Sequence, residues 1–275
     1  MKKLLKPIHR VIKGYLKNQW EPIPAILDPH DRVIGHSHEG RPILAYRINE
    51  GSKQVLFTSV LHGNEVGTQR LNHYLYQWVQ EHANEFKECS FWFVPCLNPD
   101  GFAHALRHPD YLKGGRKGRF NGRDVDLNRN FPVKSFRKDS NWNHGANYKE
   151  LTPVFCGEEG GSENETKALT DFILKEKIAL LFMFHNVGED VMPSNDPLAQ
   201  KLADLFVSRT GFATMTHEDW KSLGQTGTCK EWCEENHVSF LEVEGSVKST
   251  RYGSDWKRQK PGLEACLREL KVLLN

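Results

Sequence analysis

His62 and Glu65 are two residues with metal-binding side chains, and they follow directly after the apolar segment VLFTSVL at 55–61. A glycine between them lets the chain turn, so that the imidazole and the carboxylate can point at one position. A neutral imidazole and a carboxylate suit a borderline-soft ion such as Zn²⁺. Taken alone, the pair is better explained by a surface histidine beside a glutamate that begins a helix.

Two further titratable residues end apolar segments. His185 follows ALLFMF at 179–184, and Glu244 ends VSFLEVE at 238–244. Burying an imidazole costs free energy unless it has a partner. A hydrogen-bonded core histidine and a metal ligand both satisfy that condition, and for His185 alone the core histidine is the simpler interpretation.

Arg119 and Arg129 stand ten positions apart in a polar segment, with Asn121, Asn128 and Asn130 beside them. Arginine is a rigid fork that binds a carboxylate through two hydrogen bonds, and asparagine adds neutral donors. The segment therefore fits an anion receptor. A solvated loop has the same composition, so composition alone does not decide between the two.

The elements that must position these residues alternate along the chain. A hairpin is predicted at 32–49. Strands are predicted at 55–61, 89–97, 179–184 and 238–244, and helices at 65–84, 162–176, 195–210, 226–236 and from Pro261 onwards. The helix at 162–176 has Ser162 as its expected N-cap and Glu165 at the capping-box position. The segment 98–160 shows no periodicity and is expected to be functional rather than regular.

This alternation predicts one α/β domain with a mixed β-sheet that helices cover on both faces. Functional sites in such sheets gather at the carboxyl ends of the strands. His62, His185 and Glu244 all fall there. We expect a basic N-terminal arm or helix at 1–30 and a catalytic domain at 31–275.

Composition excludes several classes of protein. The chain has 275 residues and a formal net charge of +2, whereas a bulk nucleic-acid binder needs a strong basic excess. No apolar run is long enough for a transmembrane helix, so we expect no stable membrane insertion. The six cysteines are scattered, which indicates reduced thiols and a cytoplasmic protein. Cys229 and Cys233 lack the second pair that a structural zinc site needs.

Several short motifs resemble those of the zinc carboxypeptidase family, the carboxypeptidase A-like metallopeptidases. They are IGHSHEGRPI at 34–43, HGNE at 62–65, NPDG at 98–101, DLNRNFP at 126–132, SENET at 162–166, FH at 184–185 and a terminal strand that ends in glutamate. Within the family, the segment 227–245 is most similar to the small bacterial murein peptide amidases, which trim cell-wall peptides. The resemblance implies a zinc-carboxypeptidase-like fold, one Zn²⁺ per chain and a small peptide substrate.

The resemblance also assigns roles to residues. It implies three zinc ligands: His62, Glu65 and His185. Arg119 matches the arginine that polarises the scissile carbonyl. Asn128 and Arg129 match the pair that receives the terminal carboxylate of the substrate.

The general base implied by the resemblance is a glutamate near the end of the last strand, and two residues compete for the role. Glu242 and Glu244 are two positions apart and share one strand face. Counting from Trp232 favours Glu244, and the family usually has threonine at the position of Glu242. In this scheme the glutamate takes a proton from zinc-activated water and passes it to the leaving amine.

Two other functions fit part of the pattern. N-acyl amino acid deacylases of the aspartoacylase and succinylglutamate desuccinylase type share HGNE, a similar NRxFP loop and a histidine after a strand. NPDG and SENET favour the peptidase. A non-catalytic zinc-binding relative is the third interpretation, and the complete set of ligands, arginines and a candidate base argues against it.

Overall fold

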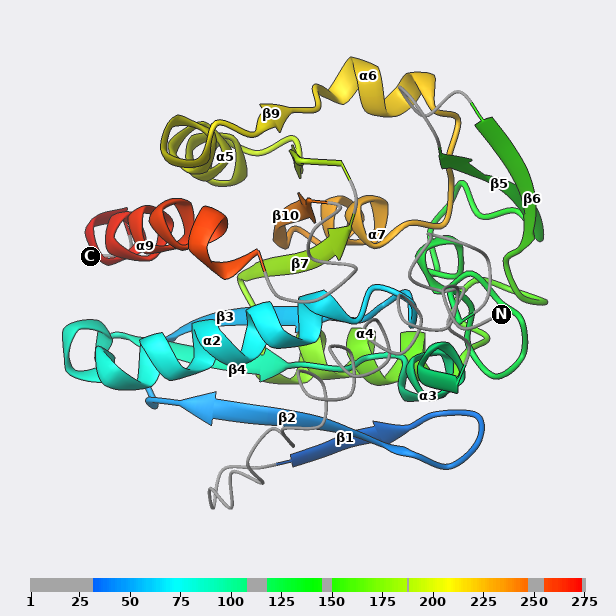
Figure 1. Ribbon diagram of the computed structural model, residues 1–275, viewed down its shortest axis with the longest axis horizontal. Coiled ribbons are helices and arrows are strands. Elements are labelled where there is room, and N and C mark those ends of the chain that lie inside the picture. The colour runs from blue at the N-terminus through cyan, green and yellow to red at the C-terminus, as the bar shows by residue number, and fades with distance from the viewer. Residues whose placement is uncertain (1–31, 108–117, 145–149, 187, 247–254, 274–275) are drawn as a thin grey trace, which may run out of the picture.

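The structure, a computed structural model, describes residues 32–107, 118–144, 150–186, 188–246 and 255–273. Its centre is an eight-stranded mixed sheet (Figure 1). In spatial order the strands are β1 (Arg32–His36), β2 (Pro42–Ile48), β4 (Cys89–Val94), β3 (Lys53–Ser59), β7 (Leu180–Asn186), β10 (Ser239–Gly245), β8 (Asp190–Pro193) and β9 (Ala213–Thr214). The predicted arm at 1–30 lies outside the described residues, so the division into arm and catalytic domain stays a prediction.

The four central strands β4, β3, β7 and β10 run parallel to one another. Strand β2 pairs antiparallel with β4 on one side, and β8 pairs antiparallel with β10 on the other. The predicted hairpin is confirmed as the antiparallel pair of β1 and β2. Because the central strands are parallel, their carboxyl ends meet at one edge of the sheet.

Helices cover both faces of the sheet, as predicted. One apolar core joins the sheet to α2 (Gly67–Glu81), α5 (Pro197–Thr210) and α9 (Trp256–Leu273). The core on the opposite face joins it to α4 (Asn164–Glu176) and α7 (Cys229–Glu235). The central strands are therefore buried on both sides, which explains their continuous apolar sequences.

Aromatic rings fill the centre of the first core. Phe57 of β3 stacks on Phe93 of β4 and on Phe182 of β7, with ring centroids 5.1 Å apart in each pair. These contacts join β4 to β3 and β7, the two strands that lead to His62 and His185.

Two predicted helix starts are wrong. The N-cap of α4 is Glu163, without a side-chain cap, because the Ser162 hydroxyl instead donates to the Glu163 carboxylate at 2.7 Å. Glu165 forms no capping box, since its carboxylate accepts a hydrogen bond from Asn121 at 3.2 Å. Helix α9 begins at Trp256 and contains Pro261 in its interior, so the proline does not mark the start.

The segment 98–160, for which no regular structure was predicted, contains several elements. Helix α3 spans Pro99–Arg107, and a separate two-stranded sheet pairs β5 (Asp139–His144) with β6 (Glu150–Phe155). A 3₁₀ turn at Leu127–Arg129 lies between α3 and β5 in the chain. Outside this segment, the structure also contains the 3₁₀ helix η1 (Ala83–Phe86) and the short helix α6 (His217–Ser222). Strand β5 reads DSNWNH and so lacks the apolar alternation of a half-buried strand.

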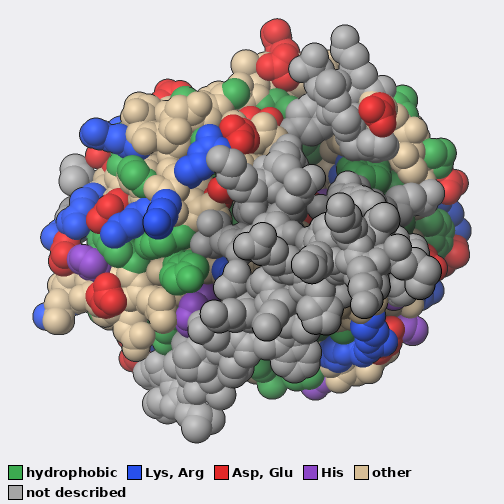
Figure 2. Space-filling model, in the orientation of Figure 1, with side chains coloured by type: hydrophobic (Ala, Val, Ile, Leu, Met, Phe, Trp, Pro, Cys, Tyr) green, Lys and Arg blue, Asp and Glu red, His purple; other side chains and the backbone are tan. Residues whose placement is uncertain are grey.

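On the face shown in Figure 2, Lys and Arg side chains lie among Asp and Glu side chains, in keeping with the small net charge. Among the described helices, none combines the length and the apolarity needed to cross a bilayer.

Candidate active site

The turn after β3 brings His62 and Glu65 to the carboxyl edge of the sheet. Gly63, between them, packs directly on the backbone of the NPDG segment. A Cβ atom at Gly63 would lie 2.1 Å from the carbonyl carbon of Gly101 and 2.3 Å from the nitrogen of Phe102. Only glycine permits this approach, so the packing of two separate motifs fixes the direction of the turn.

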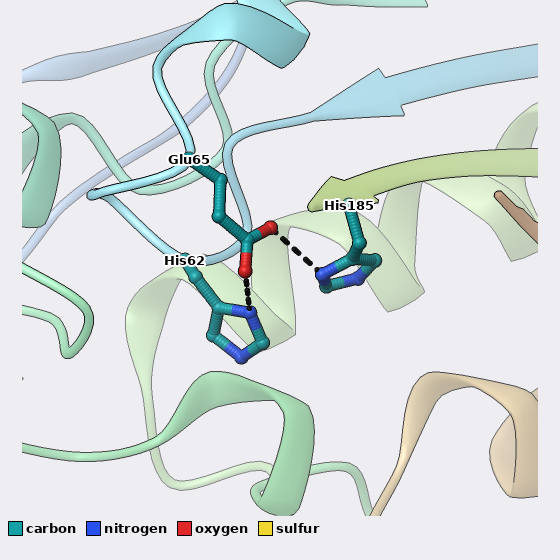
Figure 3. Close-up of side chains that lie close together, drawn as sticks. All are labelled: His62, Glu65 and His185. Carbon is teal, nitrogen blue, oxygen red and sulfur yellow. Dashed lines mark hydrogen bonds and ion pairs between the residues drawn. The ribbon is translucent and has the colours of Figure 1, made fainter. Parts of the chain in front are cut away.

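His62, Glu65 and His185 converge, with the carboxylate between the two imidazole rings (Figure 3). His62 Nδ1 lies 2.9 Å from Glu65 Oε1, and His185 Nδ1 lies 3.0 Å from Glu65 Oε2. One potential ligand atom from each residue lies within 4.8 Å of the others, and all three side chains are buried. Two neutral imidazoles and a carboxylate make a donor set that fits zinc.

Asp126 orients one of these imidazoles. Its Oδ1 lies 3.1 Å from His62 Nε2. Burial raises the pKa of Asp126, but Arg119 and His62 outweigh that effect and hold it well below its usual range. With a metal at Nδ1, the ionised carboxylate would accept the Nε2 proton of His62. A carboxylate behind a ligating histidine is a common feature of zinc sites.

The carboxylate of Glu65 and the imidazoles of His62 and His185 attract one another electrostatically. Burial raises the pKa of Glu65, but attraction to His62 and His185 outweighs it and lowers the value to about 2. Burial lowers the pKa of His185, but Glu242 and Glu65 outweigh that and raise it to about 9. A buried carboxylate thus attracts positive charge to this position, and a divalent cation would replace the proton.

Arg119 is held beside the candidate ligands by Asp126. Its Nε and one terminal nitrogen donate to Asp126 Oδ2 at 3.1 and 3.0 Å. The guanidinium also stacks on Trp142 of β5, 4.5 Å from the ring centroid. Its other terminal nitrogen lies 3.8 Å from Glu65 Oε1. The group is therefore fixed where it can donate to an oxygen of a bound substrate.

Asn128 and Arg129 lie in the 3₁₀ turn, which Asp126 caps by accepting from the Asn128 backbone N–H at 3.1 Å. The Arg129 guanidinium donates to the carbonyls of Asn128 at 2.6 Å and of Asn141 at 3.4 Å. Among the described residues, no carboxylate bonds to it. Burial lowers the pKa of Arg129, and the negative charge of Asp126 opposes this. Arg129 is thus a buried cation with capacity for an anion.

Glu242 and Glu244 lie on β10, next to the strand that carries His185. In the β7–β10 ladder, Glu244 is opposite His185 and Glu242 is opposite Met183. Glu242 Oε2 lies 3.9 Å from His185 Nε2. Each glutamate has one buried oxygen without a hydrogen-bond partner among the described residues. Burial raises the pKa of Glu244 well above its ordinary value.

The structure thus brings the predicted site residues to one edge of the sheet. Asp126, which touches His62, Arg119 and Asn128, had no predicted role although it begins the DLNRNFP motif. Trp142 was also missed. For Asp126, an acidic residue beside two arginines was a usable signal, whereas nothing in the sequence near Trp142 pointed to Arg119.

Comparison with known proteins places these residues in a family context. The family model for zinc carboxypeptidase matches residues 15–228. Murein peptide amidase A of Escherichia coli strain K12 is 27% identical over 154 residues, which are 55% of this chain and 56% of that protein. Carboxypeptidase O of Bos taurus is 27% identical over 175 residues, covering 58% of this chain and 45% of that protein. The chain thus aligns with about half the length of these relatives.

A solved structure extends the similarity of the fold. The murein-tripeptide amidase of Escherichia coli O157 superposes with a TM-score of 0.65 at 21% sequence identity, over 90% of this chain and 94% of the other. At this identity the likeness concerns the fold alone.

Proposed function

Since the chain belongs to the zinc carboxypeptidase family, we propose that it hydrolyses an amide bond next to a free carboxylate in small peptides. One observation carries the proposal: two imidazole Nδ1 atoms face one buried carboxylate at 2.9 and 3.0 Å, beside two buried arginines. A structural histidine pair would have no need of the arginines, which suit an anionic substrate.

His62, Glu65 and His185 are the residues that would hold one zinc ion per chain. When bound, zinc supplies Lewis-acid activation of a carbonyl and of water. Asp126 would keep His62 in the tautomer that leaves Nδ1 free. These side chains come from the turn after β3 and from β7, so the rigid sheet sets their spacing.

Arg119 and Arg129 would bind different groups of the substrate. Arg119, held by two hydrogen bonds to Asp126 and stacked on Trp142, would donate to the carbonyl oxygen as negative charge develops there. Arg129 and Asn128 would receive the terminal carboxylate and orient the peptide. Since Arg129 hydrogen-bonds to carbonyls alone within the described residues, its charge is available for that anion.

Glu244 would act as the general base, accepting a proton from the attacking water and delivering it to the leaving amine. Its place opposite His185 in the ladder brings it nearer the carboxyl edge of the sheet than Glu242. Burial keeps its pKa high, which favours proton uptake, while a nearby dication would lower it again.

Peptides of the kind found in murein are the substrates we propose to test first, because the relatives include murein peptide amidase A. The six cysteines are free thiols, and we propose a reducing compartment, the cytoplasm, as the setting.

The experiment is an assay of the zinc-loaded protein against short N-acylated peptides with a free terminal carboxylate, beside the same peptides with that carboxylate amidated and a panel of N-acyl amino acids. The proposal expects zinc-dependent release of the terminal amino acid from the free-carboxylate peptides. Hydrolysis of the N-acyl amino acids alone would instead favour the deacylase. Stoichiometric zinc without any turnover would favour the non-catalytic relative.

A further inference from the structure

Strand β5 contacts both arginines of the candidate active site through adjacent residues. The Asn141 carbonyl accepts a hydrogen bond from Arg129 Nε at 3.4 Å, and the Trp142 ring lies against the Arg119 guanidinium. The β5–β6 pair stands apart from the central sheet (Figure 1), and Trp142 belongs to none of the apolar cores that the described residues form. Packing against the sheet therefore does not account for this tryptophan, whereas contact with Arg119 does.

The β5–β6 pair is anchored to the rest of the protein through both of its strands. On β6, the Phe155 carbonyl accepts a hydrogen bond from the Asp126 backbone N–H at 2.9 Å. On β5, the buried Asn143 side chain donates to the Leu223 carbonyl at 3.3 Å and accepts from Gln225 Nε2 at 3.3 Å. The residue that precedes Asn143 is Trp142, so its ring stands on a strand whose position is fixed from two directions.

The hydrogen bonds of Arg119 leave the tilt of its guanidinium open. Nε and one terminal nitrogen donate to the same oxygen, Asp126 Oδ2, at 3.1 and 3.0 Å. Two donors on one acceptor fix the edge of the group but constrain the tilt of its plane less than a fork in which each N–H has its own oxygen. The other terminal nitrogen lies 3.8 Å from Glu65 Oε1, whose charge attracts it. The Trp142 ring, with its centroid 4.5 Å from the guanidinium carbon, is the contact that opposes a change of tilt.

We propose that Trp142 is a positioning residue, whose indole holds the Arg119 guanidinium at the tilt in which its remaining terminal nitrogen points at the carbonyl oxygen of the bound peptide. This rests on the proposed function, which supplies that oxygen. The ring also keeps water from one face of the guanidinium and attracts its charge. A donor held in place before the reaction stabilises the developing negative charge without the cost of reorienting. Trp142 therefore acts on the reaction through Arg119.

The kinetic test is a double-mutant cycle between Trp142 and Arg119 in the zinc-loaded protein, with a free-carboxylate peptide as substrate. Trp142→Leu should lower kcat about 3- to 30-fold, the range for a cation–π contact, with little change in KM. Trp142→Phe retains a ring face and should keep most of the wild-type kcat. In the Arg119→Ala background, Trp142→Leu should cost nothing further, because the tryptophan then has no guanidinium to hold. Leu151→Ala, at a 58% exposed residue of β6, is the matched control and should leave kcat unchanged.

Nuclear magnetic resonance of the protein with isotope-labelled arginine tests the same contact without turnover. The Nε–H signal of Arg119 is identified by its disappearance in Arg119→Lys. In the wild type, the ring current of the indole should shift this signal upfield. Trp142→Leu should move it toward the position of an unstacked arginine, and Leu151→Ala should leave it in place. Zinc content and thermal stability are measured for every variant. If Trp142→Leu does not fold, Trp142→Met, which keeps a long apolar side chain without a ring, takes its place in both experiments.

Three outcomes would overturn the inference. If Trp142→Leu causes the same loss of kcat with and without Arg119, the tryptophan supports the structure and does not act through the arginine. If KM rises while kcat is unchanged, Trp142 binds substrate instead. If the Arg119 signal is the same in the wild type and in Trp142→Leu, the ring does not hold the guanidinium. Absence of all peptide hydrolysis in the wild type would overturn the proposed function, and the Arg119 signal would then decide alone whether Trp142 positions Arg119.

Discussion

Zinc uptake by this protein should release a proton from His185. Glu242 and Glu65 outweigh the effect of burial and raise the pKa of that imidazole to about 9. At pH 7 the protonated form therefore exceeds the neutral form by about 100-fold. Only the neutral form can ligate a metal, so the apparent zinc affinity at pH 7 should be about 100-fold below its limit at high pH.

The zinc affinity should therefore rise with pH. Affinity should rise by about tenfold for each pH unit up to about pH 9 and level off above it, because the raised pKa keeps the competing proton bound to that point. Glu65, whose pKa is lowered to about 2, is ionised throughout this range and adds no slope.

Calorimetric titration of the metal-free protein with zinc, in buffers of different ionisation enthalpy, measures the protons released. We expect His185 to contribute about one proton per zinc at pH 7, about half at pH 9 and about a tenth at pH 10, and any proton that zinc displaces from Glu244 adds to that number. Glu242→Gln removes a charge that raises the pKa of His185, so its affinity should level off at a lower pH. An affinity that is already constant above pH 6.5, or zinc binding at pH 7 without proton release, would refute this account of the ion pair.

Four substitutions test the other roles. His185→Ala should abolish bound zinc at neutral pH, and full occupancy by atomic absorption would exclude this ligand set. Arg129→Ala should lower kcat/KM for free-carboxylate peptides much more than for amidated ones, whereas equal losses would mean that it does not bind that carboxylate. Glu244→Gln should retain zinc but lose about 10²–10⁴-fold in kcat, while Glu242→Gln should cost far less. The reverse pattern would make Glu242 the base. Asp126→Asn should weaken zinc binding by about 10- to 100-fold, and unchanged affinity in a chelator competition would show that the hydrogen bond to the histidine is dispensable.

The sequence predicted the central sheet well because parallel strands buried on both faces have an unmistakable composition. The apolar runs before His62 and His185 form β3 and β7. The expected position of each histidine at the carboxyl end of a strand is confirmed. The β5–β6 pair escaped prediction because β5 is polar and lacks apolar alternation, and because β6 contains Pro153, which argues against a strand. It nevertheless carries Trp142, which stacks on Arg119.

Strand periodicity could not separate Glu242 from Glu244, because residues two apart on a strand point to the same face. The ladder adds that Glu244 is level with His185 and that Glu242 lies two positions deeper, opposite Met183. A pattern in one sequence reports which face a side chain shares and its order along the strand, whereas the residue that it lies level with on the neighbouring strand comes only from the register.

Asp126 explains why motifs far apart in the chain form one unit. One of its oxygens faces His62 Nε2 and accepts from the Asn128 backbone N–H, and the other accepts two hydrogen bonds from Arg119. A single carboxylate thereby orients a candidate metal ligand, fixes the arginine beside it and caps the turn that carries Arg129. A shift of Asp126 would misplace all three at once. Since catalysis of this kind depends on groups held in advance around the reacting carbonyl, the coupling through Asp126 gives the site its rigidity, and it required a contact between residues 64 positions apart that no local sequence pattern encodes.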